Sequence, residues 1–186
     1  MKRVVDLLSG MLLALLFVFP LLIIAIFVKL TSSGPVLYWS NRVGRDNVIF
    51  LMPKFRTMLQ DTPAVATHLL IDARNFLTPI GSFLRRSSLD ELPQLWSIIK
   101  GDMSLVGPRP ALFNQDDLIG LRTQFGVEKI LPGLTGWAQI NGRDELTIAQ
   151  KVALDVEYLQ RQSFFLDMRI IFLTFLKVIR RDGVVH

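Results

Sequence analysis

The sequence predicts a mainly α-helical protein with one small β-hairpin, in which a membrane-inserted N-terminal helix is joined to one compact domain. Three observations support this fold class: a long uncharged run at the N-terminus, a single pair of β-rich runs, and two helical patterns near the C-terminus. We set the boundary between residues 1–30, the membrane element, and residues 31–186, the domain. About 155 residues suit a single hydrophobic core.

The membrane element is predicted from residues 7–28, which carry no charge between Asp6 and Lys29. Twenty-two residues would make a helix of roughly 33 Å, against about 30 Å for a bilayer core. A cleaved signal peptide would need a shorter apolar region and a small-residue cleavage site, which does not follow Phe27. A buried core helix is a further alternative, but runs of this length without a polar stripe are rare in water-soluble domains.

Pro20 lies near the middle of this run and predicts a kink or break, because it lacks an amide hydrogen and clashes with the carbonyl of Leu16. Basic residues flank the run on both sides, with Lys2 before it and Lys29 after it, so that both flanks favour the cytoplasm. Two alternatives remain at this point. One is a kinked spanning helix, the commoner outcome for such a run, and the other is a re-entrant helix that bends at Pro20 and returns.

The domain begins with a predicted β-hairpin at residues 36–58, where two β-rich runs are separated by the polar turn NRVGRDN. Residues 59–79 show little periodicity apart from a possible short helix at 64–76. Residues 80–100 follow a helical pattern that breaks at LDELP.

Two segments rich in glycine and proline are predicted to be irregular loops: GDMSLVGPRP at 101–110 and PGLTGWAQINGR at 132–143. Two such loops in one domain suggest a functional site. Helices are predicted at 147–161 and at 164–181.

The last predicted helix has one narrow polar stripe on an otherwise apolar surface; the stripe consists of Asp167, Thr174, Lys177 and Arg181. This pattern is typical of an amphipathic helix lying in a membrane interface. It fits a helix packed in the domain core equally well.

Composition narrows the chemistry. The chain has no cysteine, which excludes disulfides, thiolate metal sites and a catalytic cysteine. Lysine and arginine outnumber aspartate and glutamate by 21 to 16, which favours anionic partners. Next to a membrane segment, we expect these partners to be lipid head groups and phosphorylated substrates, not nucleic acid.

The acidic pair Asp90-Glu91 in RRSSLDELPQLW is the main catalytic candidate. Neighbouring residues can serve one small site most readily at a helix terminus, and Pro93 suggests a terminus with Asp90 as its N-cap. Simple capping by Asp90, or a capping box formed by Ser88 and Glu91, would explain these residues without any catalytic role.

The surroundings of Asp90 favour a catalytic role. Arg85, Arg86 and a helix N-terminus would keep its carboxylate ionised and attract phosphate. An ionised carboxylate can act as a nucleophile toward phosphorus. It can also hold Mg²⁺, which prefers oxygen ligands shared with substrate phosphates.

Arg109 is the complementary cation, because Pro108 and Pro110 stiffen its backbone and a guanidinium so aimed suits a diphosphate. A solvent-exposed arginine in a tight turn is the plain alternative. Lys54, Arg56 and Arg143 are further cations at strand or loop ends, and each alone is more often solvated than functional.

Three motifs in this order resemble one family: KFRTM, RRSSLDELPQLWSIIKGDMSLVGPRP and PGLTGWAQINGR, behind an apolar N-terminus. They are similar to the bacterial sugar transferases, small monotopic polyprenyl-phosphate phosphoglycosyl transferases. The resemblance implies an enzyme on the cytoplasmic face of the bacterial inner membrane that moves a sugar 1-phosphate from a UDP-sugar to undecaprenyl phosphate and releases UMP. Such a step starts O-antigen or capsule assembly. The alternative is a non-enzymatic membrane-anchored adaptor that binds lipid or protein through its basic surface.

The resemblance also implies residue roles. Asp90 would be the nucleophile that forms a phosphosugar intermediate, and Glu91 its partner in proton handling or acceptor positioning. Mg²⁺ would bind at Asp90 and the diphosphate. The residues that would bind the donor are Lys54, Arg56, Arg85, Arg109, Gln139, Asn141 and Arg143.

The resemblance further favours the re-entrant alternative for the N-terminal helix. The family breaks this helix at a Ser-Pro pair, whereas Phe19 stands here in place of the serine, so the break depends on Pro20 alone. Membrane lipids are further expected partners, nucleic acid is not, and the sequence leaves a homo-oligomer open.

Overall fold

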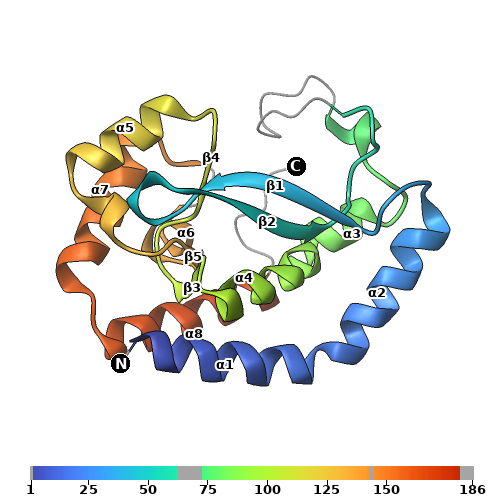
Figure 1. Cartoon of the computed structure of the whole chain (residues 1–186), viewed down its shortest axis with the longest axis horizontal. Helices are drawn as coiled ribbons and strands as arrows, with labels where there is room; N and C mark the ends of the chain where they lie inside the picture. Colours follow the sequence, from blue (N-terminus) through green and yellow to red (C-terminus); the bar gives the residue numbers. More distant parts are fainter. Residues whose placement is uncertain (1, 63–72, 143–144, 181–186) are drawn as a thin grey trace.

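The computed structural model describes residues 2–62, 73–142 and 145–180 (Figure 1). The helices are α1 (Lys2–Leu16), α2 (Val18–Thr31), α3 (Gly81–Arg86), α4 (Leu95–Lys100), α5 (Asp116–Gln124), α6 (Trp137–Ile140), α7 (Ile148–Arg161) and α8 (Phe164–Arg180). The strands are β1 (Leu37–Val43), β2 (Ile49–Phe55), β3 (Ser104–Val106), β4 (Ala111–Leu112) and β5 (Gly133–Thr135). Short 3₁₀ helices are η1 (Arg45–Asn47), η3 (Ala73–Phe76), η4 (Leu89–Gln94) and η5 (Val127–Lys129). The prediction of a mainly helical fold with a small sheet is confirmed.

The predicted hairpin is confirmed as β1 and β2, which pair antiparallel from Leu37–Phe55 to Val43–Ile49. Its turn places Asp46 and Asn47 at positive φ, a conformation that these two residue types tolerate better than most. Strand β4 then adds to the free edge of β1, so that the sheet order is β2-β1-β4. Figure 1 shows this sheet lying over α4, with α1 and α8 beyond.

The prediction that residues 101–110 and 132–143 are irregular loops is wrong, because they contain β3, β5 and α6. Strands β3 and β5 pair in parallel, with Ser104 opposite Gly133. The glycines permit close contact between backbones: a Cβ on Gly107 would lie 2.4 Å from the carbonyl oxygen of Leu131. Here glycine allows regular pairing instead of interrupting it.

The helical pattern of residues 80–100 is confirmed, with its break, as α3, η4 and α4. Helix α4 ends at Gly101, whose φ of 108° is the left-handed conformation typical of a helix C-cap. The short helix predicted at 64–76 lies largely outside the described residues, which resume with the single turn η3. No element was predicted where α5 lies.

The N-terminal helix bends by 60° at Phe17, between α1 and α2, and not at Pro20. Helix α1 ends at Leu16, the residue whose carbonyl Pro20 cannot bond, and Pro20 then occupies the first turn of α2. Proline therefore acts as predicted, but the break lies three residues earlier. Within the described ranges no single helix is long and apolar enough to cross a membrane, although α1 and α2 together have that length and composition.

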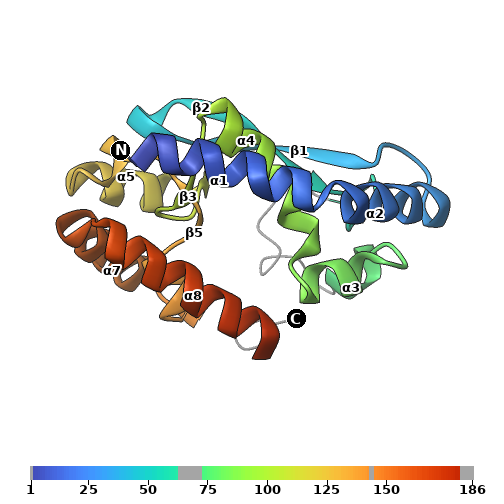
Figure 2. The same ribbon diagram turned by 90° about the horizontal axis from the view of Figure 1, so that it is seen from below.

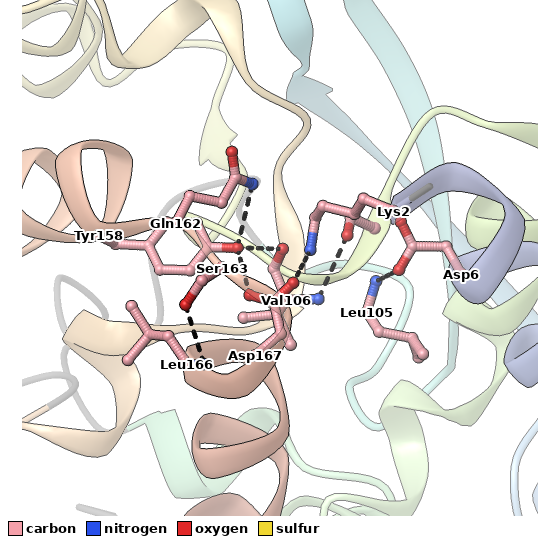
Figure 3. Close-up of polar contacts among 10 residues, drawn as sticks. Lys2, Asp6, Leu105, Val106, Tyr158, Gln162, Ser163, Leu166 and Asp167 are labelled. Atoms are coloured by element: carbon pink, nitrogen blue, oxygen red, sulfur yellow. Dashed lines mark hydrogen bonds and ion pairs between the residues drawn. The ribbon is translucent and has the colours of Figure 1, made fainter.

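Both ends of the α1–α2 pair are attached to the domain. At the start of α1, Lys2 forms an ion pair with Asp167 of α8 at 2.6 Å, and Arg3 donates to the carbonyls of Ile98 and Ile99 in α4. Asp6 is buried, and its Oδ1 accepts from the backbone amide of Leu105 at 3.1 Å. Figure 3 shows this polar cluster, in which Asp167 also accepts from the hydroxyl of Tyr158 at 2.7 Å.

At the other end of the pair, α2 packs on the domain through Ile24 and Val28, which share a buried cluster with Phe55 and Leu84. Just beyond α2, the guanidinium of Arg56 donates to the carbonyl of Ser32 at 2.8 Å and to its hydroxyl at 2.7 Å. The two ends of the bent pair thus contact one and the same domain.

Two members of the polar stripe on α8, Asp167 and Thr174, face inward, whereas Arg181 lies outside the described residues. Asp167 is 7% exposed, and Thr174 shares a hydrogen bond of 2.6 Å with Thr135 of β5. Up to residue 178, where the described side chains of this helix end, the exposed large apolar ones are Phe164, Phe165, Met168, Phe172, Phe175 and Val178. Helices α1 and α2 expose a similar set. In Figure 1 α1 and α8 both lie along the lower side of the molecule, and α2 continues from the end of α1, as Figure 2 also shows. Helix α8 therefore packs on the domain core through Leu166 and Ile170, as one alternative expected, while its wide apolar face points outward.

Candidate active site

The predicted acidic pair and two of the predicted cations meet where β2, η4 and the loop 107–110 come together. Glu91 of η4 accepts a hydrogen bond from Lys54 of β2 at 2.8 Å and another from Arg109 at 2.6 Å. The second nitrogen of Arg109 lies 3.5 Å from the other oxygen of Glu91. A carboxylate at the centre of two charge-assisted contacts is a strong, directional arrangement.

The two cations keep Glu91 ionised. Burial by itself would raise the pKa of Glu91, but Arg109 and then Lys54 lower it well below its usual range. Burial lowers the pKa of Lys54, and the nearby charge of Glu91 acts in the opposite direction. The charges of Glu91, Lys54 and Arg109 therefore compensate one another in this buried site.

Asp90 is 7% exposed, and its pKa is shifted the other way. Burial raises the pKa of Asp90, and the charge of Glu91 adds to that effect, while Lys54, Arg85 and Arg109 oppose it. Arg85 acts on Asp90 in the expected direction, since its charge lowers this pKa, but burial is the larger effect; Arg86 is exposed. The result is a more basic carboxylate among three cations.

The local structure of the pair also differs from the prediction. Asp90 is not an N-cap but the second residue of the 3₁₀ helix η4, and Pro93 lies inside the same helix. Ser88 occupies the cap position without a side-chain cap bond, so no capping box forms with Glu91. The φ of Ser88 is 56°, a strained value for a residue other than glycine, asparagine or aspartate. The chain is thus sharply turned just before the acidic pair.

Arg85, predicted to bind phosphate, lies in this site. It is half-buried on α3, donates to the hydroxyl of Thr57 at 3.0 Å, and acts electrostatically on Asp90. Arg56 does not lie in the site, because its hydrogen bonds go to Ser32 and its side chain is buried. Alternation along a strand would place Lys54 and Arg56, two positions apart, on the same face, but β2 ends at Phe55 and Arg56 lies beyond it.

The structure describes two of the three candidate binding residues in PGLTGWAQINGR. Gln139 of α6 has its amide buried, with no hydrogen-bond partner for either atom in the described part of the chain, and its Oε1 lies beside Gly136. Asn141 is exposed and donates to the carbonyl of Trp137 at 2.8 Å, so in this structure it caps α6. Arg143 lies outside the described residues.

Arg42 of β1 is a cation that the sequence reasoning missed. Its guanidinium donates to the hydroxyl of Ser40 at 3.0 Å and to the carbonyl of Pro110 at 3.2 Å. Burial, and then the charge of Arg109, lower its pKa to about 10. The available signal was the period-2 pattern of the hairpin, which places Ser40 and Arg42 on one face.

Among the described residues of this site, Asp90 is the candidate metal ligand. Within the described ranges no group of three or more histidine, aspartate or glutamate side chains comes together. Glu91 is held by Lys54 and Arg109, which leaves Asp90 as the oxygen ligand at this point. One carboxylate fits the mode in which Mg²⁺ is shared with substrate phosphates, and not a cage formed by the protein alone.

The charge balance of the site favours a dianionic group. Four cations, Arg42, Lys54, Arg85 and Arg109, face two carboxylates, which leaves two positive charges in excess. A diphosphate carries two negative charges, and a carboxylate beside it can attack phosphorus. This arrangement fits a phosphoryl-transfer enzyme.

Comparison with known proteins agrees. The family model for bacterial sugar transferases matches residues 1–181, and the chain belongs to this family. It is 41% identical over 187 residues to the uncharacterized sugar transferase EpsL of Bacillus subtilis (strain 168), covering 99% of this chain and 90% of that one. The family membership confirms the predicted phosphoglycosyl transferase class.

Other relatives have names that state a reaction. The chain is 40% identical over 186 residues to the UDP-glucose:undecaprenyl-phosphate glucose-1-phosphate transferase of Escherichia coli (strain K12), covering 95% of this chain and 40% of that one. It is 38% identical over 189 residues to the exopolysaccharide production protein ExoY of Rhizobium meliloti (strain 1021), covering 93% and 83%. The chain thus spans less than half of the E. coli relative and most of ExoY.

Proposed function

We propose that this enzyme transfers a sugar 1-phosphate from a UDP-sugar to undecaprenyl phosphate, releases UMP, and uses Asp90 as a covalent nucleophile. The observation that carries the proposal is the buried Asp90 beside a Glu91 held by Lys54 and Arg109. The positive excess of the site suits the diphosphate of the donor. Homologues with this reaction in their names support the same substrates.

The proposed reaction has two displacements. An oxygen of Asp90 attacks the β-phosphorus of the donor, the bond from that phosphorus to the bridging oxygen breaks, and UMP leaves with that oxygen. A phosphate oxygen of undecaprenyl phosphate then attacks the same phosphorus, which releases Asp90 and yields the undecaprenyl diphosphate sugar. The raised pKa of Asp90 makes its ionised form a better nucleophile, and Arg109 and Arg85 offset charge on the phosphate oxygens.

Mg²⁺ belongs to this proposal as a shared ligand of Asp90 and the donor phosphates. It would supply charge neutralisation at the diphosphate. Removal of divalent cations with EDTA should abolish UMP release, and added Mg²⁺ should restore it. Full activity in EDTA would contradict this part of the proposal.

We further propose that the enzyme lies on the cytoplasmic face of the bacterial inner membrane and that α1 and α2 form a re-entrant helix. The contacts of Lys2 and Arg3 at one end of the pair, and of Ser32 with Arg56 at the other, join both ends to the same domain, which supports a location of both ends on one side of the membrane. A straight spanning helix would separate these ends by about 30 Å of hydrocarbon. The exposed apolar faces of α1, α2 and α8 would then contact lipid.

The proposed activity is tested by measuring UMP release from a panel of UDP-sugars with undecaprenyl phosphate. UDP-glucose and UDP-galactose come first, because relatives carry these sugars in their names. Asp90→Asn should reduce release to background. Asp102→Asn is the matched control, because Asp102 forms a surface ion pair with Lys100 away from the site.

The covalent intermediate needs its own test, because the lipid phosphate could instead attack the donor directly while Asp90 only holds the metal. Donor labelled in the sugar phosphate is incubated with enzyme in the absence of acceptor. Stable label on the wild type but not on the Asp90→Asn variant supports the intermediate. UMP release that strictly requires acceptor, without labelled protein, would overturn it.

A further inference from the structure

The loop that carries Arg109 is held through its backbone carbonyls by three donors from other segments of the chain. Pro108 and Pro110 cannot donate backbone hydrogen bonds, yet three consecutive carbonyls in this loop accept one each. The carbonyl of Pro108 accepts from the amide of Gly133 at 2.8 Å, that of Arg109 from Arg122 at 2.8 Å, and that of Pro110 from Arg42 at 3.2 Å. The backbone around Arg109 is therefore fixed by β5, α5 and β1.

Arg122 is the most constrained of these donors. It lies on α5, and its Nε and one terminal nitrogen donate to a single oxygen of Asp155 on α7, at 3.0 and 2.7 Å. The remaining terminal nitrogen is the one that donates to Arg109. The side chains of Arg122 and Asp155 are 12% and 2% exposed, and Figure 1 shows α5 and α7 packed side by side at the edge of the sheet.

A buried ion pair that merely joined two helices would need only two of these contacts. The third one reaches a backbone carbonyl in a different segment, the residue whose side chain holds Glu91 at 2.6 Å. Lysine could not replace this arrangement, because a single ammonium group cannot present a planar fork to Asp155 and a separate donor to the loop. The contact network therefore runs from α7 through α5 to the acidic pair.

We propose that Arg122, oriented by Asp155, is a positioning residue that fixes the direction of Arg109 toward Glu91 and the donor diphosphate. This inference rests on the proposed function for its kinetic consequences. Misplacing a charged group by about 1 Å in a transferase site can cost up to about 100-fold in rate. Arg122→Lys should therefore lower kcat/KM for the UDP-sugar by about tenfold or more while the protein stays folded.

The test is whether this loss depends on Arg109. Kinetics of UMP release are measured for Arg122→Lys alone, for Arg109→Gln alone, and for the double variant. If Arg122 acts through Arg109, the change to lysine lowers kcat/KM in the wild-type background but by less than about twofold in the Arg109→Gln background. An equal factor in both backgrounds, or no loss in the wild type, overturns the proposal.

Val152→Ala is the matched control for stability. Val152 lies on α7 in the buried cluster with Leu118 of α5, so the substitution loosens the same helix contact without touching the polar network. It should lower the unfolding temperature and change kcat/KM by the same factor with or without Arg109. If Arg122→Lys does not fold, the paired variant Arg122→Gln/Asp155→Asn replaces it, because that variant leaves neither charge buried alone.

A second measurement does not require activity and so separates this inference from the proposed function. Unfolding temperatures are measured for Arg122→Lys, Glu91→Gln and the two together. Arg122 and Glu91 share no direct contact, so coupling between them must pass through Arg109, and the two losses should be clearly less than additive. Additive losses would overturn the positioning role, whereas a wild type that releases no UMP would refute the proposed function alone.

Discussion

Replacing Glu91 by glutamine tests whether its two ion pairs hold the site together. The substitution keeps the shape of the side chain but leaves the ammonium of Lys54 and the guanidinium of Arg109 without their shared carboxylate. Breaking a buried pair by removing one partner costs about 3–5 kcal/mol. Lys54 is 16% exposed and Arg109 is 33% exposed, so solvent screens part of the loss, and we expect about 3 kcal/mol.

For a chain of this size, about 3 kcal/mol corresponds to a fall of roughly 6–12 °C in the unfolding midpoint. The assay is thermal unfolding in detergent or nanodiscs, followed by circular dichroism. Asp102→Asn is the control, because Lys100 and Asp102 form a pair of similar length, 2.9 Å, in which the lysine is 57% exposed. Its cost should stay below about 1 kcal/mol. Equal midpoints for Glu91→Gln and the wild type would refute the reasoning.

The Glu91→Gln substitution should also change how the stability of the protein depends on pH. Burial lowers the pKa of Lys54, and Glu91 is the largest influence acting against this. In the Glu91→Gln variant the pKa of Lys54 should fall further, so the folded state binds fewer protons than the unfolded state below the normal lysine range. The free energy of unfolding of the variant should then rise with pH in the range just below the normal lysine pKa. The difference in unfolding free energy between the variant and the wild type should become smaller there. A difference in unfolding free energy that grows toward alkaline pH would contradict this prediction.

Three further experiments test the fold and its placement at the membrane. Gly107→Ala should destabilise the protein by more than about 2 kcal/mol, because its Cβ would lie 2.4 Å from the Leu131 carbonyl oxygen. Gly120→Ala in α5, where a Cβ would meet no atom within 4 Å, should instead stabilise the protein by about 0.5–1 kcal/mol. Equal effects of the two substitutions in unfolding experiments would refute the packing argument. A single cysteine can be added before Met1, because the chain has none. In a re-entrant topology this cysteine should resist membrane-impermeant thiol reagents in intact cells and react only after lysis. Labelling from outside intact cells would refute that topology. The double variant Phe165→Ser/Phe172→Ser should weaken vesicle binding severalfold with little change in the unfolding midpoint, because these side chains are 84% and 60% exposed. Unchanged vesicle binding would exclude the apolar face of α8 as the lipid contact.

Much of this protein could be predicted from local patterns. The hairpin at 36–58 follows from β-rich runs around a polar turn, and the helices α7 and α8 follow from their periodicity. Asp90, Glu91, Lys54, Arg85 and Arg109 do meet in one site, as their motifs suggested. The site could be anticipated because each of its parts lies in a short segment of unusual composition.

Other features depended on distant contacts. Gly107 and Gly133 were expected to interrupt regular structure, but their small size lets β3 and β5 pair. Arg42 lies in a strand whose sequence marks no chemistry, and Arg122 and Asp155 look like ordinary charges on two helices. Arg56 belongs to a basic motif yet bonds to Ser32, and Pro20 moves the bend to Phe17.

The sequence by itself therefore determined the hairpin, the main helices, the family and the chemical groups available for phosphoryl transfer. Only the tertiary structure decided which cations face Asp90 and Glu91, and in which direction their pKa values move. The physical reason is that periodicity, turn chemistry and motif composition are local properties of the chain. Burial, charge pairing and close backbone contact instead arise when segments distant in sequence pack together, and so Glu91 holds Lys54 and Arg109 while Asp90 is left as the more basic carboxylate.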